Sequence, residues 1–140
     1  MYQRASLGHE EAQKAVAAIQ AELQRRGKAA VIAVADAHGE LLALLRLDGA
    51  PLPSIVIATN KAYTAARERK PTRDIGQRSR DPERGFDMAY FGDRRYIGWG
   101  GGLPVTINGE VVGAVAVSGL SEMEDIEIAQ AGVNAILDQI

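Results

Sequence analysis

The run LPVTINGEVVGAVAVS (residues 103–118) decides the fold. It contains two β-rich segments, Leu103–Ile107 and Glu110–Ser118, which are separated by Asn108-Gly109. Asn-Gly favours a type I′ turn, whose backbone twist matches that of two antiparallel strands. The run therefore predicts a β-hairpin.

A second pair of short apolar segments lies upstream, at Ala30–Asp36 and Leu41–Leu47. Asp36 and Gly39 supply the turn residues between them, so this pair also predicts a hairpin. Both segments are apolar almost throughout, which is typical of strands that are covered on both faces. We therefore expect a sheet with a layer on each side, formed by helices or by another subunit.

Three further segments have apolar residues at helical spacing. They span approximately His9–Arg26, Ser54–Lys70 and Ser121 to the C-terminus. Gly27 and Pro71 are suitable stops for the first two, and Ser121 with Glu124 forms a capping-box pattern at the start of the third. Because the strands are joined as hairpins and not as β-α-β units, the elements predict an α+β fold with an antiparallel sheet.

The chain has 140 residues, of which 46% are hydrophobic and 24% charged, and we expect a single globular domain over residues 1–140. It has no cysteine, which excludes disulfides and thiolate metal ligands. The net charge is −2 and no apolar run is long enough to span a membrane, so neither nucleic acid nor a membrane is expected as a partner. Residues 1–8 lack the apolar core of a signal peptide, and a cytoplasmic location is expected.

The stretch 71–98 has the composition of a long irregular loop or arm. Its arginines are interleaved with acidic residues, and it holds both phenylalanines, Phe86 and Phe91. Disordered segments are poor in aromatic residues, so we predict an ordered arm or a lid.

Several familiar catalytic motifs are absent. There is no phosphate-binding loop, and Gly100–Gly102 precede a strand and not a helix, so they do not form a dinucleotide cradle. The two histidines, His9 and His38, fall in a first helical turn and a hairpin turn, where exposure to solvent is expected. No metal site is predicted.

The remaining candidates are charged residues at the ends of elements. Arg46 and Asp48 follow the second strand, Lys61 lies in an alanine-rich helix, and Glu124 and Asp125 open the last helix. In the structural interpretation Lys61 is a solvated flank of its helix and Glu124 is only a cap. In the functional interpretation they border a shallow pocket at the helix–sheet edge, and Lys61 acts as a general base or forms a Schiff base.

The ligand-binding residues expected around that pocket come from two further segments. Backbone N–H groups of Gly100, Gly101 and Gly102 would form its floor, and Lys61 with an arginine would attract a carboxylate or a propionate. The predicted ligand-binding set is Arg46, Arg94, Arg95, Tyr96, Trp99, Gly100, Gly101 and Gly102.

Several segments together resemble the GlcG/HbpS family, the "haem-degrading" domain that also forms the C-terminal part of some PduO-type corrinoid enzymes. They occur in the order of the family and extend from about Ala30 to the C-terminus. The matching stretches are VADAHG (34–39), RLDGA (46–50), Ser54-Ile55, KAYTA (61–65), Pro71-Thr72, GGLPV (101–105) and GEVVGAVAVSG (109–119).

The resemblance implies a profilin-like α/β/α sandwich around an antiparallel sheet of about five strands, and assembly into homo-oligomers. This chain departs from the family at one position, where Glu124 precedes Asp125 in place of the usual glutamine. An acid at that position favours proton transfer or a cation. The segment 73–99 also lacks a family pattern, which suggests a ligand particular to this member.

Three hypotheses for the function follow. The favoured one is a metal-free enzyme, of the lyase, isomerase or hydrolase type, that acts on a small carboxylate or ring compound in a catabolic pathway. It would use Lys61, Asp48 and Glu124 or Asp125 for acid–base chemistry, with Arg94 or Arg95 holding the anion. The second hypothesis is haem binding, and the third is a non-catalytic accessory oligomer.

The second hypothesis is a protein that binds haem or another tetrapyrrole. It requires an apolar slot, cations for the propionates and an axial ligand. The available side chains for that ligand are His38, Met88, Tyr90 and Tyr96.

Lys61 also carries a prediction about stability. If Lys61 were a buried, unpaired charge, Lys61→Met would leave folding intact or improve it.

Overall fold

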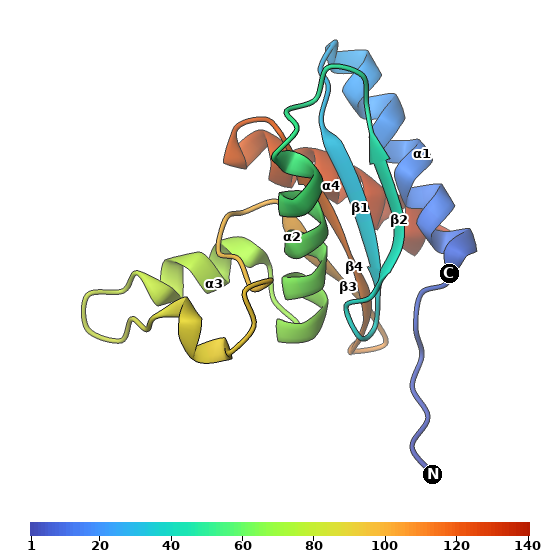
Figure 1. Cartoon of the computed structure of the whole chain (residues 1–140). Coiled ribbons are helices and arrows are strands. Elements are labelled where there is room, and N and C mark those ends of the chain that lie inside the picture. Colours follow the sequence, from blue (N-terminus) through green and yellow to red (C-terminus); the bar gives the residue numbers. More distant parts are fainter.

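The computed structural model describes residues 1–140 as four α-helices, one short 3-10 helix and four strands (Figure 1). In chain order the elements are α1 (His9–Arg26), β1 (Val31–Asp36), β2 (Leu41–Arg46), α2 (Ser54–Glu68), α3 (Thr72–Ser79), η1 (Met88–Phe91), β3 (Gly102–Ile107), β4 (Glu110–Ser118) and α4 (Glu122–Leu137).

The strands form one antiparallel sheet in the order β2-β1-β4-β3. Both predicted hairpins are confirmed. Asn108 and Gly109 have φ values of 53° and 77°, which is the left-handed conformation that a type I′ turn requires at both central positions. The expected number of about five strands is wrong, because the residues between α2 and β3 form helical turns and supply no further strand.

Helices cover both faces of the sheet, so the predicted α/β/α sandwich is confirmed (Figure 1). Alternate residues of the central strands point to opposite layers. Ile32, Val34, Val115 and Val117 pack with α1 and α4 in a core of bulky side chains. The other face packs against α2 and is made largely of alanines: Ala33, Ala35, Ala114 and Ala116 from the sheet, and Ala58, Ala62, Ala65 and Ala66 from α2.

Small residues bring α2 close to the sheet. A Cβ added at Gly102 would lie 2.5 Å from the carbonyl oxygen of Lys61, so only glycine fits at the start of β3 beside this turn of α2. Ala58 and Ala62 flank Lys61 on the helix and are fully buried. The close approach explains why a lysine in this helix lies in the interior and not at the surface.

The arm (residues 71–98) projects to one side of the sandwich (Figure 1). It is less irregular than expected, because it contains α3 and η1. The stretch 72–79 is polar overall and has only Thr72, Ile75 and Gly76 buried, which is why its helix was not evident from the apolar spacing.

An aromatic cluster orders the second half of the arm. The rings of Phe91 and Tyr96 stack with their centroids 4.2 Å apart, and Phe86 and Tyr63 contact them edge-on. The hydroxyl of Tyr63 donates a hydrogen bond to Asp93 at 2.5 Å. These contacts join the arm to α2.

Coverage of β2 differs from the expectation. This strand is at the edge of the sheet, and Leu41 and Leu44 remain exposed because α2 lies over β1, β4 and β3. The helix α2 also ends two residues before the predicted Lys70, at a left-handed Arg69. None of the helices combines the length and the apolar character that crossing a membrane demands.

Candidate functional site

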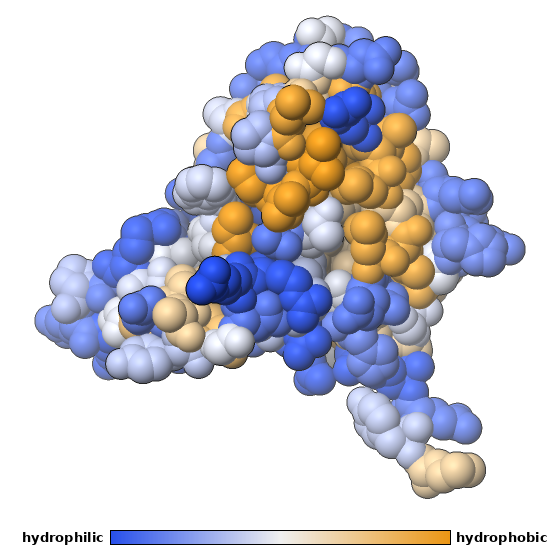
Figure 2. All heavy atoms as spheres, in the orientation of Figure 1, coloured by the Kyte–Doolittle hydropathy of each residue, from blue (hydrophilic) through white to orange (hydrophobic).

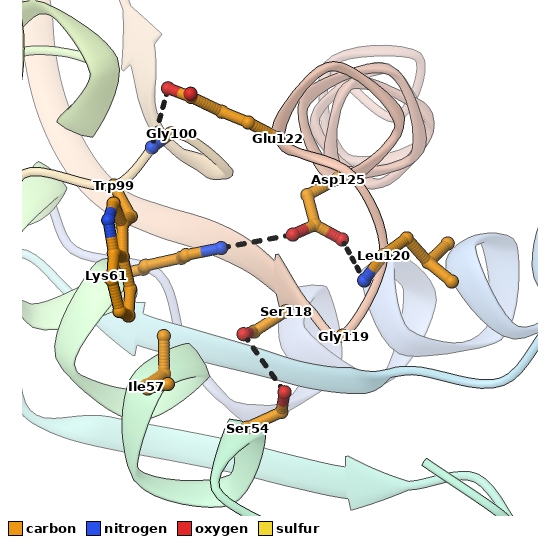
Figure 3. Close-up of a pocket in the computed structure, with 10 residues that line it drawn as sticks. All are labelled: Ser54, Ile57, Lys61, Trp99, Gly100, Ser118, Gly119, Leu120, Glu122 and Asp125. Carbon is orange, nitrogen blue, oxygen red and sulfur yellow. Dashed lines mark hydrogen bonds and ion pairs between the residues drawn. The ribbon is translucent and has the colours of Figure 1, made fainter. Parts of the chain in front are cut away.

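A pocket of about 340 Å³ opens where the first half of α2 meets the end of β4 and the start of α4 (Figure 3). Ser54, Ile57 and Lys61 reach it from α2, since residues three and four positions apart share one face of a helix. The remaining lining residues are Trp99, Gly100, Ser118, Gly119, Leu120, Glu122 and Asp125.

Lys61 and Asp125 form a buried ion pair at this pocket (Figure 3). The two residues are 2% and 3% exposed. The Lys61 Nζ donates to Asp125 Oδ2 at 3.2 Å and to the carbonyl oxygen of Val117 at 3.0 Å. Asp125 Oδ1 accepts from the backbone N–H of Leu120 at 3.1 Å, which fixes the carboxylate in the first turn of α4.

Burial shifts both groups of the pair toward their neutral forms. Desolvation lowers the pKa of the Lys61 ammonium, and the attraction of Asp125 opposes this shift. Desolvation likewise raises the pKa of the Asp125 carboxyl, against the pull of Lys61 and of the Leu120 N–H. Buried acids and bases whose pKa values are shifted in these directions are the kind of group that acid–base catalysis uses.

Two serines form the polar wall next to the ion pair (Figure 3). The hydroxyl of Ser118 donates to that of Ser54 at 3.2 Å, and both residues are buried. The Ser54 hydroxyl has no acceptor for its own hydrogen among the protein hydrogen bonds. The pair therefore offers a donor to a molecule in the pocket.

Of the three glycines expected to form the pocket floor, only Gly100 lines the pocket. The N–H groups of Gly100 and Gly102 already donate to Glu122 Oε1 and to Thr72 Oγ1, each at 3.0 Å. A Cβ at Gly101 would lie 2.7 Å from the Lys61 Nζ. The glycines thus permit close packing around Lys61, and the expectation of a free N–H floor is wrong for Gly100 and Gly102.

Glu124 lies outside the pocket, and Glu122 takes its place. Glu124 pairs with Lys28 at 2.5 Å and bonds to Ser121, so it acts as a cap and a surface ion pair. Residues 122 and 125 are three apart and share a face of α4, whereas 124 is turned away from it. That spacing could have indicated Glu122 from the sequence.

Arg46 and Asp48 do not join Lys61 either. They line a separate hollow of about 350 Å³ between β2 and the end of α1, together with Lys28. The expectation that Asp48 shares a catalytic site with Lys61 is therefore wrong. Arg46 and Asp48 follow an edge strand, and the edge lies away from the part of the sheet that α2 covers.

The arm residues of the predicted ligand set are also elsewhere. Arg95 pairs with Asp93 at 3.0 Å and lies over the ring of Tyr63, and Tyr96 accepts a hydrogen bond from Arg67. Arg94 is exposed and does not line the pocket. Trp99 does line the pocket and is 59% exposed, so it forms the rim.

Sequence reasoning missed six of the ten lining residues as members of the site: Ser54, Ile57, Ser118, Gly119, Leu120 and Glu122. Ile57 is three residues from Ser54 and four from Lys61, and this helical spacing was the available signal. Leu120 had no such signal, because it contributes through the β4–α4 turn, whose path depends on the tertiary structure. No three histidine, cysteine, aspartate or glutamate side chains come together as a metal-binding group.

Haem does not fit this pocket as one chain presents it. The lining contains no histidine, methionine, cysteine or tyrosine that could serve as an axial ligand, and the Lys61 amine is already bonded to Asp125 and Val117. Of the four candidate ligands, Met88 lines a smaller hollow on another side of Trp99, and Tyr90 is exposed on η1. His38 and Tyr96 lie together at the other end of α2.

Comparison with known proteins gives consistent matches along the chain. The family model described as "Haem degrading protein HbpS-like" matches residues 7–134. The protein GlcG of Escherichia coli K12 is 35% identical over 112 residues, which are 80% of this chain and 81% of GlcG.

Two solved structures are similar over nearly the whole chain. The protein ORFY of Klebsiella pneumoniae has a TM-score of 0.92 and 30% identity, with 98% of this chain and 94% of ORFY covered. A double mutant of HbpS from Streptomyces reticuli has a TM-score of 0.85 and 30% identity, with 96% and 89% covered.

Proposed function

This chain belongs to the HbpS-like family, and we propose that it is a small-molecule enzyme in which Lys61 moves a proton to or from a small carboxylate or ring compound. The observation that carries the proposal is the buried Lys61–Asp125 pair at a pocket of about 340 Å³. A concave site that holds titratable groups with shifted pKa values is the usual setting for acid–base catalysis.

Each wall of the pocket has a role in this chemistry. Lys61 in its neutral form accepts a proton from the substrate and returns it when protonated, and Asp125 stabilises the ammonium between the two steps. The Ser54 hydroxyl donates to a substrate oxygen, and Trp99 packs against an apolar or ring portion. The volume limits the substrate to a small molecule.

The proposal predicts an unusual titration of Lys61. In protein labelled with ¹³C-lysine, the Lys61 side-chain signal should titrate at a pH below the ordinary range of a lysine, because burial lowers its pKa. Short-chain hydroxy and oxo carboxylates should shift the Lys61 signal selectively when they bind. A Lys61 midpoint within the ordinary range of a lysine would contradict the proposed proton transfer.

Two variants separate ligand contact from loss of fold. Trp99→Ala removes an exposed rim side chain and should weaken carboxylate binding while the folded state persists. Lys70→Met is the matched control, because it removes an exposed lysine outside the pocket. Equal binding by the wild type and Trp99→Ala would exclude this pocket as the carboxylate site.

Haem binding is the second candidate, and the family match favours it. The test is a titration with haemin followed by its Soret band, run on the wild type beside Lys61→Ala. A saturable, stoichiometric shift in the wild type would support haem binding, and its weakening in a variant that keeps its circular dichroism spectrum would place the haem near Lys61. A flat or non-saturable response would remove this candidate and leave the acid–base proposal.

Assembly into a homo-oligomer belongs to the same proposal. Figure 2 shows hydrophobic residues gathered over the start of α2 and over β2. The exposed apolar side chains of this patch are Leu41, Leu44, Leu52 and Val56. Contiguous apolar surface of this kind usually marks a protein interface, and a second copy of the chain is the occupant that the family resemblance favours.

A further inference from the structure

A hollow of about 260 Å³ lies at the C-terminal end of α2, remote from Ser54. Four separate parts of the chain border it: the N-terminal segment, the turn between β1 and β2, the end of α2 and the arm. The lining residues are Arg4, Ala37, His38, Ala66, Arg67, Arg69 and Tyr96. The hollow therefore has three guanidinium groups and an imidazole in its lining, and no carboxylate.

The protein leaves most of this positive charge unpaired. Neither Arg67 nor Arg69 has a carboxylate oxygen within 4.0 Å, and the one ion pair of the three arginines joins Arg4 Nε to Glu110 at 3.6 Å. The Nε of Arg4 is also buried without a hydrogen-bond partner. Guanidinium groups that converge without anions are complementary to an anionic ligand.

Two of the arginines are held in place before any ligand binds. The Arg67 Nε donates to the hydroxyl of Tyr96 at 3.1 Å, and its guanidinium lies over the ring of Tyr63 at 4.9 Å from the centroid. Gly39 makes room for the stem of Arg67, since a Cβ there would lie 2.9 Å from Arg67 Cγ. Arg4 is fixed by a hydrogen bond from Nη2 to the carbonyl of Val111 at 2.6 Å.

Several donors at the hollow remain free for a ligand that is rich in acceptors. The terminal nitrogens of Arg67 make no hydrogen bond within the protein, and Tyr96 accepts from Arg67 and so keeps its own hydrogen to donate. The helix dipole explains why a cation lies in the last turn of α2. It does not explain the presence of Arg4 and Tyr96 at the same hollow, because these residues come from other segments of the chain. Arg69 occupies a left-handed position, with a φ of 58°, at which helices commonly end on glycine.

We propose that this hollow binds a small molecule through a phosphate group, with Arg67, Arg69 and Arg4 contacting the phosphate oxygens and Tyr96 donating to one of them. A guanidinium binds phosphate through two parallel N–H donors, and the available volume suits a phosphate with a short organic part. The site is separate from the Lys61 pocket, because the two share no lining residue.

The test is calorimetric titration with inorganic phosphate and with pyrophosphate at constant ionic strength. Saturable binding is expected, and Arg69→Gln should weaken it by about tenfold, or about 1.4 kcal/mol. Arg69 is exposed, so its removal leaves the fold in place. Tyr96→Phe, which keeps the stacked ring but removes the hydroxyl, should also weaken binding.

Three results would overturn the proposal. The first is no saturable binding of either phosphate probe. The second is an equal loss of affinity in Arg84→Gln, an exposed arginine of the arm outside the hollow, because that would indicate general charge attraction. The third is tighter binding of citrate than of pyrophosphate, which would assign the hollow to carboxylates.

Discussion

Lys61 has the only buried ammonium group among the lysines, and its partner Asp125 lies 64 positions along the chain. Burying two charges is costly unless they are paired and hydrogen-bonded. Here Val117 and Leu120 supply the remaining backbone partners. Each charged group of the pair thus has a backbone partner besides its counter-ion, and each half depends on the other.

Replacing Lys61 alone should destabilise the protein. Lys61→Met leaves the Asp125 carboxylate buried without its cation, so we expect the free energy of unfolding at pH 7 to fall by about 3–5 kcal/mol. The expectation that Lys61→Met leaves folding intact or improves it assumed that the buried ammonium has no partner. The ion pair with Asp125 contradicts that assumption. Urea denaturation monitored by circular dichroism measures the change.

A double variant provides the control for this prediction. Lys61→Met with Asp125→Asn removes both charges and keeps an amide oxygen that accepts from Leu120. It should recover more than half of the lost stability. Equal stability of the single and double variants would mean that the cost does not come from an unpaired carboxylate.

Glu22 gives the molecule a specific sensitivity to acid. Hydrogen bonds from Arg25 and Arg26 lower the pKa of Glu22 from 4.5 to about 2. The Glu22 carboxylate therefore binds its proton at higher pH in the unfolded chain than in the folded chain. Ionised Glu22 stabilises the folded state above pH 4.5, and this stabilisation is lost as pH falls to about 2. The unfolding free energies of the wild type and Glu22→Gln should converge over this range.

Salt provides the control for the Glu22 effect. All three side chains are on the surface of α1, so the stabilisation is screened by added salt. Denaturation curves in high salt should reduce the difference between the wild type and Glu22→Gln at neutral pH. A difference that persists unchanged from neutral pH down to about 2 would contradict the assigned pKa shift of Glu22.

At the scale of elements, α3 positions the rim of the Lys61 pocket. Gly76 of α3 packs so closely on the segment before β3 that a Cβ there would lie 1.9 Å from the carbonyl oxygen of Gly98. The next residues along that segment, Trp99 and Gly100, line the pocket. Arg73 of α3 also pairs with Glu122 of the pocket at 3.5 Å.

Gly76→Ala should therefore alter the pocket without unfolding the core. The added methyl group must displace residues 97–100, so we expect faster hydrogen exchange there and weaker binding of small carboxylates. Exchange in α1 and α4, which pack on the other face of the sheet, should not change. Gln77→Ala, one residue along α3 and exposed, is the matched control, and an identical effect of both variants would contradict the packing argument.

At the scale of the whole molecule, the apolar patch of Leu41, Leu44, Leu52 and Val56 predicts self-association. Burying a side chain of this size contributes about 1.5–3 kcal/mol, so a charge at its centre should oppose assembly strongly. We expect the wild type to run as an oligomer in light scattering coupled to size exclusion, and Val56→Asp to run as a monomer. Val56 is exposed, so the variant should keep its circular dichroism spectrum.

Tyr90→Asp is the control for the assembly prediction. Tyr90 is a large exposed side chain on the arm, outside the patch, and is 85% exposed. Its replacement should leave the oligomer intact. A monomeric wild type would overturn the prediction, and dissociation by Tyr90→Asp would move the interface to the arm.

Much of the fold was predictable from local sequence patterns. The helix stop at Gly27, the Asn108-Gly109 turn and the Ser121 cap depend on neighbouring residues alone, and all three occur as expected. Within the candidate site, Lys61, Asp125, Trp99 and Gly100 were predicted and do line one pocket. Helix α3 was not predicted, because its apolar face is too short to show a period.

The sequence by itself determined α1, α2 and α4, the two hairpins and the antiparallel α+β class, because spacing and turn chemistry act over a few residues. Only the tertiary structure decided that Lys61 faces Asp125, that Glu122 and not Glu124 enters the pocket, and that Asp48 lies elsewhere. Those outcomes depend on how close α2 lies to the sheet and on the direction in which α4 leaves it. Such distances arise from packing between segments far apart in the chain, which no local pattern encodes.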